Sequence, residues 1–137
     1  MNCPRCGKSV DEHEAGRETD ACFAEVVMGH TVHYIDEVGG AWWGETDGPG
    51  ERGYPLRHYS TDIAAAWEGL EQMQDKYWSQ VLLGKEAGAG PHSAECEIGL
   101  YLHTPQWFNE APTASLAIVR ACLKAKLAEK EADDELS

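Results

Sequence analysis

Apolar side chains recur at helical spacing in three segments of the chain, and each segment predicts an amphipathic helix. The first helix is expected over roughly 17–28, where Gly29 is typical of the residue that ends a helix. Its apolar face consists of Thr19, Cys22, Phe23, Val26 and Val27. The third helix is expected from about 113 to about 130, with a stripe of Leu116, Val119, Leu123 and Leu127 that is widened by Ile118 and Cys122.

The second helix is expected to begin after the string Tyr59-Ser60-Thr61-Asp62. A hydroxyl of Ser60 or Thr61 can cap it, and Asp62 in its first turn suits the positive end of the helix dipole. Its apolar stripe is Ile63, Ala66, Trp67, Leu70, Met73 and Tyr77, which predicts that Trp67 lies in the core.

Strand patterns fill the gaps between these helices. Residues 33–38 and 41–44 flank Gly39-Gly40 and predict a hairpin. Residues 78–83 and 95–102 predict a second pair of strands, joined by a glycine-rich connection. The order of helix, hairpin, helix, hairpin, helix predicts an α+β fold, specifically an α-β-α layered sandwich with a largely antiparallel sheet.

A length of 137 residues with 42% hydrophobic residues fits one domain with an ordinary apolar core. We expect a Cys-x-x-Cys leader over 1–14, a single α/β sandwich domain over 15–130, and an acidic disordered tail over 131–137.

The chain is strongly acidic, with 24 acidic residues against 11 Lys and Arg and a formal charge of -13. This balance argues against direct binding to DNA or RNA, which requires a basic face. A small anionic ligand remains compatible, because it needs only two or three bases. No apolar run is long enough to cross a membrane, and the first residues lack the apolar core of a secretory signal, so we expect a cytoplasmic protein.

Several strings together resemble the phage ABA sandwich domain family, which consists of small proteins of phages and prophages. The strings are Ala15-Gly16-Arg17-Glu18-Thr19-Asp20-Ala21, Val27-Met28-Gly29, Tyr59-Ser60-Thr61-Asp62-Ile63-Ala64-Ala65-Ala66-Trp67 and Ala117-Ile118-Val119-Arg120-Ala121. The resemblance covers roughly residues 15–124 and implies a helix–sheet–helix layered fold and a phage-related source. The expected cytoplasm is then that of the bacterial host. The resemblance implies little chemistry. The chain departs from the family pattern in its Cys-Pro-Arg-Cys leader and in Ser115, where the family pattern has proline.

Cys3-Pro4-Arg5-Cys6-Gly7-Lys8 resembles half of a zinc knuckle, because two thiolates at this spacing can occupy adjacent corners of one tetrahedral Zn²⁺. Structural zinc requires four ligands, so Cys3 and Cys6 need a second pair. Three completions are open: His13 with Cys22, His92 with Cys96, or the same knuckle of a second copy. Cys22 also lies on an apolar helix face, where a buried free thiol is the alternative.

Bases are scarce in this chain, so Arg17, Arg57 and Arg120 are candidate ligand-binding residues. An arginine fork can hold a phosphate or a carboxylate, whereas the structural alternative is an ion pair with Asp20 or Asp62. Tyr59 and Trp43 complete the candidate site, because an exposed aromatic ring can stack on a nucleobase. The histidines form no catalytic set, and the segment 84–91 lacks the order of a phosphate loop.

Two main hypotheses of function follow, and a zinc-stabilised accessory protein with neither role is a third possibility. In the first, a phage accessory protein acts against host defence: a homo-oligomer binds and sequesters a small anionic ligand, in particular a nucleotide immune signal, without catalysis. In the second, the acidic surface mimics nucleic acid and blocks a host protein that has a basic groove, such as a host defence protein.

Overall fold

The structure is a computed structural model that describes residues 2–37, 40–46, 53–73, 77–83, 94–100 and 107–136. The helices are a short 3-10 turn η1 (Val10–Glu12), α1 (Arg17–Val26), α2 (Ile63–Met73) and α3 (Ala114–Leu136). The strands are β1 (Thr31–Glu37), β2 (Gly40–Thr46), β3 (Tyr54–Pro55), β4 (Tyr77–Leu83), β5 (Ala94–Leu100) and β6 (Trp107–Ala111). The expected order of helix, hairpin, helix, hairpin, helix is confirmed, and the fold is α+β.

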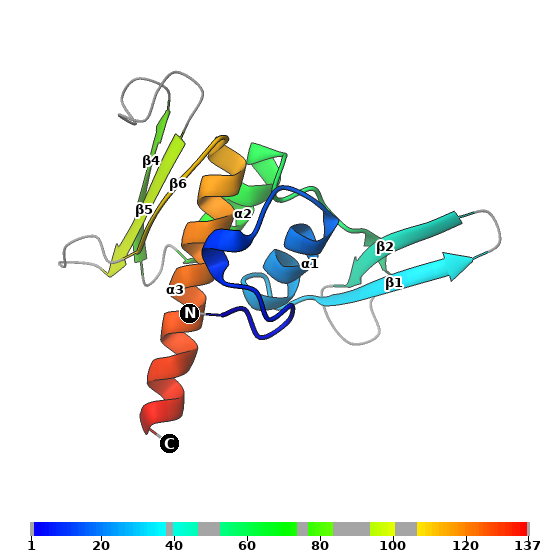
Figure 1. Cartoon of the computed structure of the whole chain (residues 1–137), viewed down its shortest axis with the longest axis horizontal. Coiled ribbons are helices and arrows are strands. Elements are labelled where there is room, and N and C mark those ends of the chain that lie inside the picture. Colours follow the sequence, from blue (N-terminus) through cyan, green and yellow to red (C-terminus); the bar gives the residue numbers. More distant parts are fainter. Residues whose placement is uncertain are drawn as a thin grey trace.

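The described strands form two antiparallel sheets of three strands, in the orders β1-β2-β3 and β4-β5-β6. The expected first hairpin is present, with Thr31 opposite Thr46 and Glu37 opposite Gly40. The sequence analysis missed the short strands β3 and β6, which add a third strand to each sheet. The helices lie between the two sheets, and the β1–β2 hairpin extends away from them (Figure 1).

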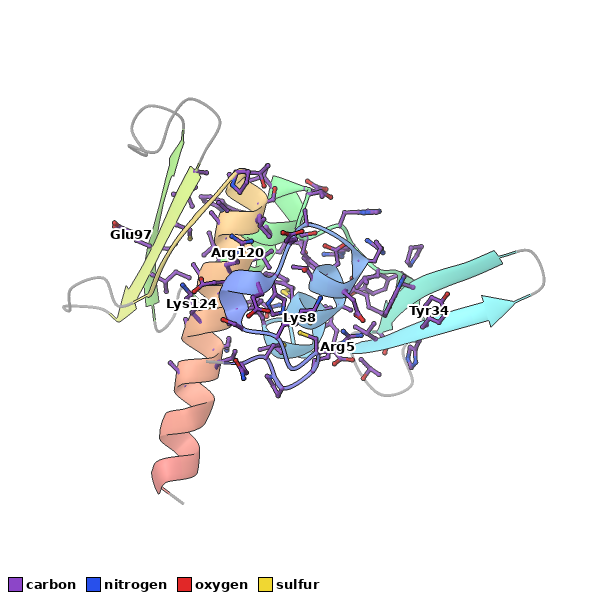
Figure 2. The ribbon with its side chains drawn as sticks, viewed as in Figure 1. Arg5, Lys8, Tyr34, Glu97, Arg120 and Lys124 are labelled. Carbon is purple, nitrogen blue, oxygen red and sulfur yellow. The ribbon has the colours of Figure 1, made fainter. Side chains whose placement is uncertain are left out.

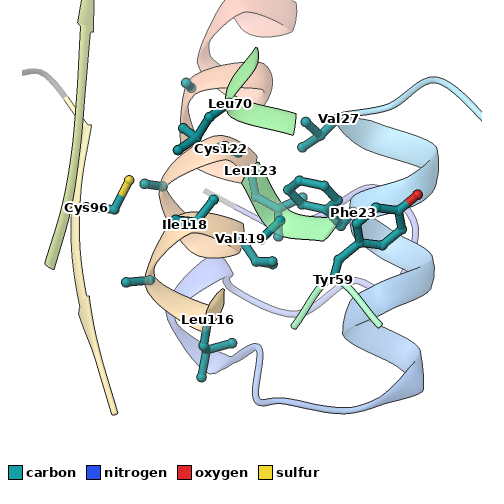
Figure 3. Close-up of a cluster of buried hydrophobic side chains, with 14 of the residues drawn as sticks. Phe23, Val27, Tyr59, Leu70, Cys96, Leu116, Ile118, Val119, Cys122 and Leu123 are labelled. Atoms are coloured by element: carbon teal, nitrogen blue, oxygen red, sulfur yellow. The ribbon is translucent and has the colours of Figure 1, made fainter. Parts of the chain in front are cut away.

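The core is centred on α3, whose apolar stripe faces α2 and the β4–β6 sheet (Figure 3). Ile118, Val119 and Leu123 are fully buried, as their helical spacing predicts. Phe23 of α1 packs against Tyr59, with the ring centroids 4.7 Å apart. Cys96 and Cys122 are buried in this core, and burial raises the pKa of the Cys96 thiol to about 12. Both therefore behave as small apolar side chains.

The expected stripe of α2 is partly wrong. Trp67 is 40% exposed and Ile63 is 44% exposed, so neither lies in the core. The buried face carries small residues instead, Ala65, Ala66 and Gly69, together with Leu70 and Met73. Gly69 lies against the ring of Phe23, where an added Cβ would overlap the ring. The close approach of α1 and α2 thus turns the bulky Trp67 outward.

The cap of α2 also differs from the expectation. The Asp62 carboxylate accepts a hydrogen bond from the backbone N–H of Ala64 at 3.0 Å, which makes Asp62 the cap. Ser60 is instead buried and bonded to α1. At the third helix, the Thr113 hydroxyl accepts a hydrogen bond from the N–H of Leu116, and α3 continues to Leu136, beyond the expected helix end at about 130.

Candidate metal centre

Four potential metal ligands from the leader and from α1 converge in one place. The ligand atoms of Cys3, Cys6, His13 and Cys22 all lie within 4.8 Å of one another. Sulfur ligands at about 2.3 Å on a tetrahedral zinc ion lie about 3.8 Å apart, so a small contraction of the cluster encloses a metal ion. Of the completions left open by the sequence, the structure assembles the pair His13 and Cys22. Cys96 lies in the core, and His92 lies outside the described residues.

The two leader thiols are held by a tight turn. The N–H of Gly7 donates to the carbonyl of Cys3 at 2.8 Å, and the N–H of Cys3 donates to the carbonyl of Lys8 at 2.8 Å. Gly7 has a φ of 78°, a conformation that side chains with a Cβ rarely adopt. The glycine of the Cys-Pro-Arg-Cys-Gly string therefore allows the chain to fold back so that Cys3 and Cys6 face the same point.

The His13 ring is oriented for coordination through Nε2. Its Nδ1 lies 3.0 Å from the carbonyl of Ser9 and 3.2 Å from that of Val10. Carbonyls only accept, so Nδ1 carries the proton and the lone pair is on Nε2. This Nε2 lies 3.3 Å from the Sγ of Cys6. The turn η1 thus fixes the tautomer that a metal ion requires.

Cys22 supplies the fourth corner from the helix. It is fully buried on α1, and Cys3 and His13 are buried beside it. Burial raises the pKa of the Cys22 thiol far above its usual value, and a hydrogen bond from Arg5 acts in the opposite direction. A metal ion would displace that proton and stabilise the thiolate.

The donor set determines what this centre can do chemically. Three thiolates and one imidazole fill all four positions of a tetrahedral zinc ion, which is typical of structural sites, whereas catalytic zinc keeps one position for water. A metal ion here would join the leader to α1. Two further contacts join the leader to α3, because Arg120 Nε donates to the carbonyl of His13 at 2.7 Å and Lys124 pairs with Asp11 at 2.8 Å.

The remaining candidate ligand residues have partners within the chain, and Arg17 Nη1 also donates to the carbonyl of Arg57 at 3.4 Å. Arg17 donates to Asp20 at 2.8 Å and also to the carbonyl of Leu56. Arg57 pairs with Glu68, and its guanidinium lies over the Tyr54 ring. These contacts match the structural alternative for Arg17, and for Arg120 the partner is a backbone carbonyl rather than a carboxylate.

The two aromatic candidates have different exposures. Tyr59 is fully buried, and its hydroxyl donates to both carboxylate oxygens of Glu45, at 3.0 and 2.9 Å. Trp43 is half-buried and contacts Tyr34 edge to face, with centroids 5.0 Å apart. The side chains of Trp42, Trp78 and Trp107 and the segment 84–91 lie outside the described residues.

The chain is similar to phage proteins in both sequence and fold. The family model of the phage ABA sandwich domain matches residues 21–123. The chain belongs to the phage ABA sandwich domain family. Its fold is similar to the 2.0 Å crystal structure of a phage protein from Bacillus cereus ATCC 14579, with a TM-score of 0.58 and 17% identity over 82% of this chain and 92% of that chain. No curated protein matches the chain.

The four candidate metal ligands of this phage ABA sandwich protein lie on both sides of the first residue of the family match. Cys22 lies within the matched segment, whereas Cys3, Cys6 and His13 precede it. The leader that departs from the family pattern therefore docks on the first helix of the family domain.

Residues from two of the strings that resemble the family are hydrogen-bonded to each other in this chain. Ser60 donates through its N–H and its hydroxyl to Oδ1 of Asp20, at 2.7 and 2.6 Å. The N–H of Gly16 donates back to the Ser60 hydroxyl at 3.0 Å. Asp20 is buried, and Arg17 neutralises it. This network joins the start of α1 to the segment that precedes α2.

Three of the four candidate metal ligands, Cys6, His13 and Cys22, line a cavity of about 720 Å³. Three bases line it, Arg5, Lys8 and Arg17, and so do the carboxylates of Glu12, Glu14 and Glu18. Of the candidate ligand residues, Arg17 is one that lines this cavity.

None of the described helices is sufficiently long and apolar to span a membrane.

Proposed function

We propose that the protein is a zinc-stabilised phage accessory protein in which Cys3, Cys6, His13 and Cys22 hold one Zn²⁺. The observation that carries this proposal is the convergence of these four ligand atoms within 4.8 Å. The His13 tautomer set by two carbonyls supports it. The donor set favours zinc, because three thiolates and one imidazole in a closed tetrahedron are typical ligands of that metal.

We propose further that the domain binds a small anionic ligand of the nucleotide class in the cavity beside the zinc site and sequesters it without catalysis. Arg17 lines this cavity and can bind a phosphate. The carboxylates of Glu12 and Glu14 can accept hydrogen bonds from ribose hydroxyls, so the mixed charge of the cavity favours a nucleotide over inorganic phosphate. In a bacterial host, sequestering a nucleotide immune signal would protect the phage.

The mimicry of nucleic acid by the acidic surface has weaker support. Of the five acidic residues between 11 and 20, Asp11 pairs with Lys124, Glu18 with Arg5 and Asp20 with Arg17. Carboxylates held in such pairs present less negative charge to a basic groove than free ones do. This observation favours the ligand-binding proposal.

Native mass spectrometry tests both parts in one experiment. We expect each subunit to carry the mass of one zinc ion, and we expect a homo-oligomer that gains mass when cyclic nucleotides or ADP-ribose-type nucleotides are added. Arg17→Gln is expected to abolish the nucleotide adduct and to retain zinc, whereas Lys126→Gln, at a residue that does not line this cavity, is expected to retain both. An oligomer that ignores every nucleotide would contradict the ligand proposal alone.

A further inference from the structure

Arg5 connects the candidate zinc site to two other elements of the fold. It lies between the two cysteines of the knuckle, and its Nη1 lies 3.7 Å from the Sγ of Cys22 on α1. Its guanidinium also lies over the Trp43 ring of β2, with Cζ 5.7 Å from the ring centroid. Figure 2 shows Arg5 where the leader meets α1 and the base of the β1–β2 hairpin.

One stripe of α1 positions the guanidinium. Glu18, Cys22 and Glu25 follow one another at helical spacing, and all three contact Arg5. Glu18 accepts from Nη1 at 2.9 Å, and the Glu25 carboxylate lies 3.2 Å from Nε. With 19% of its side chain exposed, Arg5 is held in one orientation by contacts on several sides.

The position of Arg5 matters because of the charge that a zinc-filled site would carry. Zinc with three thiolates and a neutral imidazole carries a net charge of -1, in a place where Cys3, His13 and Cys22 are buried. A buried charge is costly unless it is paired and hydrogen-bonded. Arg5 brings a positive charge and an N–H donor to one ligand sulfur. The side chains of its carboxylate partners, Glu18 and Glu25, are 62% and 36% exposed, so that solvent screens their charges.

We infer that Arg5 is a positioning residue of the zinc site, which compensates the charge of the metal-thiolate cluster through its hydrogen bond to Cys22. The inference rests on the proposed zinc site and adds a residue that coordinates nothing itself. Groups that contact metal ligands in this way typically change metal affinity by about 10- to 100-fold.

The test compares the zinc affinity of Arg5→Gln with that of the wild-type chain, by competition with a chromophoric chelator. We expect zinc binding to weaken by about 10- to 100-fold. The matched control is Lys8→Gln, which removes the same charge from the same turn, and there we expect less than about a threefold change. Arg5→Lys keeps the charge without the planar fork and is expected to restore part of the affinity.

A second readout separates positioning from general destabilisation. With Co²⁺ in place of Zn²⁺, the thiolate-to-metal charge-transfer band is expected to shift in Arg5→Gln and to stay unchanged in Lys8→Gln. Equal affinity and an unchanged band in Arg5→Gln would overturn the inference, and so would an equal loss of affinity in Lys8→Gln. A wild-type chain that takes up no zinc would instead overturn the proposed zinc site itself, and the inference with it.

Discussion

Removal of zinc is expected to lower the free energy of unfolding by about 4 kcal/mol when the free zinc concentration is a thousand times the dissociation constant. The reason is that the four ligands converge only in the folded chain, so zinc binds the folded state and stabilises it by mass action. The measurement is chemical denaturation of the wild-type protein with added zinc and with excess chelator.

Cys6→Ser is the variant that tests whether the stabilisation by zinc depends on the four proposed ligands. Cys6 is only half-buried, so its replacement by serine alters little packing and removes one thiolate. We expect its unfolding curve to be the same with zinc and with chelator, and to resemble that of the chelated wild type. A wild-type curve that does not respond to the chelator would contradict the proposed stabilisation.

Glu45→Ala is expected to lower the free energy of unfolding by about 3–5 kcal/mol, because it removes a buried carboxylate that is hydrogen-bonded to three groups. Glu45 is fully buried and accepts hydrogen bonds from the Tyr59 hydroxyl and from the N–H of Arg57 at 3.0 Å. His30 Nδ1 lies 2.7 Å from its other oxygen. Burial, together with the Glu45 charge, raises the pKa of Tyr59 far above its usual value, so that the phenol remains a donor.

Urea denaturation measures this loss, and Glu71→Ala on the exposed face of α2 is the control, expected to change stability by less than about 0.5 kcal/mol. Glu45→Gln keeps the shape and one acceptor oxygen, so a smaller loss is expected. The zinc content of all three variants should equal that of the wild type. A loss below about 1 kcal/mol in Glu45→Ala would show that this network contributes little to the fold.

The elements of the fold could be predicted where the pattern of a single segment decides them. The helical spacing of Ile118, Val119 and Leu123 and the glycines after the strand at 33–38 indicate a helix and a hairpin without further information. Trp67 could not be placed in this way, because the burial of α2 is decided by Gly69 against Phe23, a contact between two helices. The two-residue strand β3 was too short to give an alternating pattern.

The candidate site was predictable in part for the same reason. The spacing of Cys3 and Cys6 indicates half a metal site, since both ligands lie in one turn. The choice of His13 and Cys22 depends on the docking of the leader against α1 and α3, which includes the contact of Arg120 with the His13 carbonyl. Glu45 was missed altogether, because a glutamate in a strand normally faces solvent, and its buried partners lie elsewhere in the sequence.

X-ray absorption spectroscopy at the zinc edge, on protein purified without added metal, tests the central claim most directly. The account predicts one zinc ion per chain with three sulfur atoms at about 2.3 Å and one nitrogen atom at about 2.0–2.1 Å. In Cys6→Ser, whose stability is expected to respond to neither zinc nor chelator, the zinc content should fall far below one ion per chain. A protein without zinc, or a first shell made of oxygen atoms, would contradict the account.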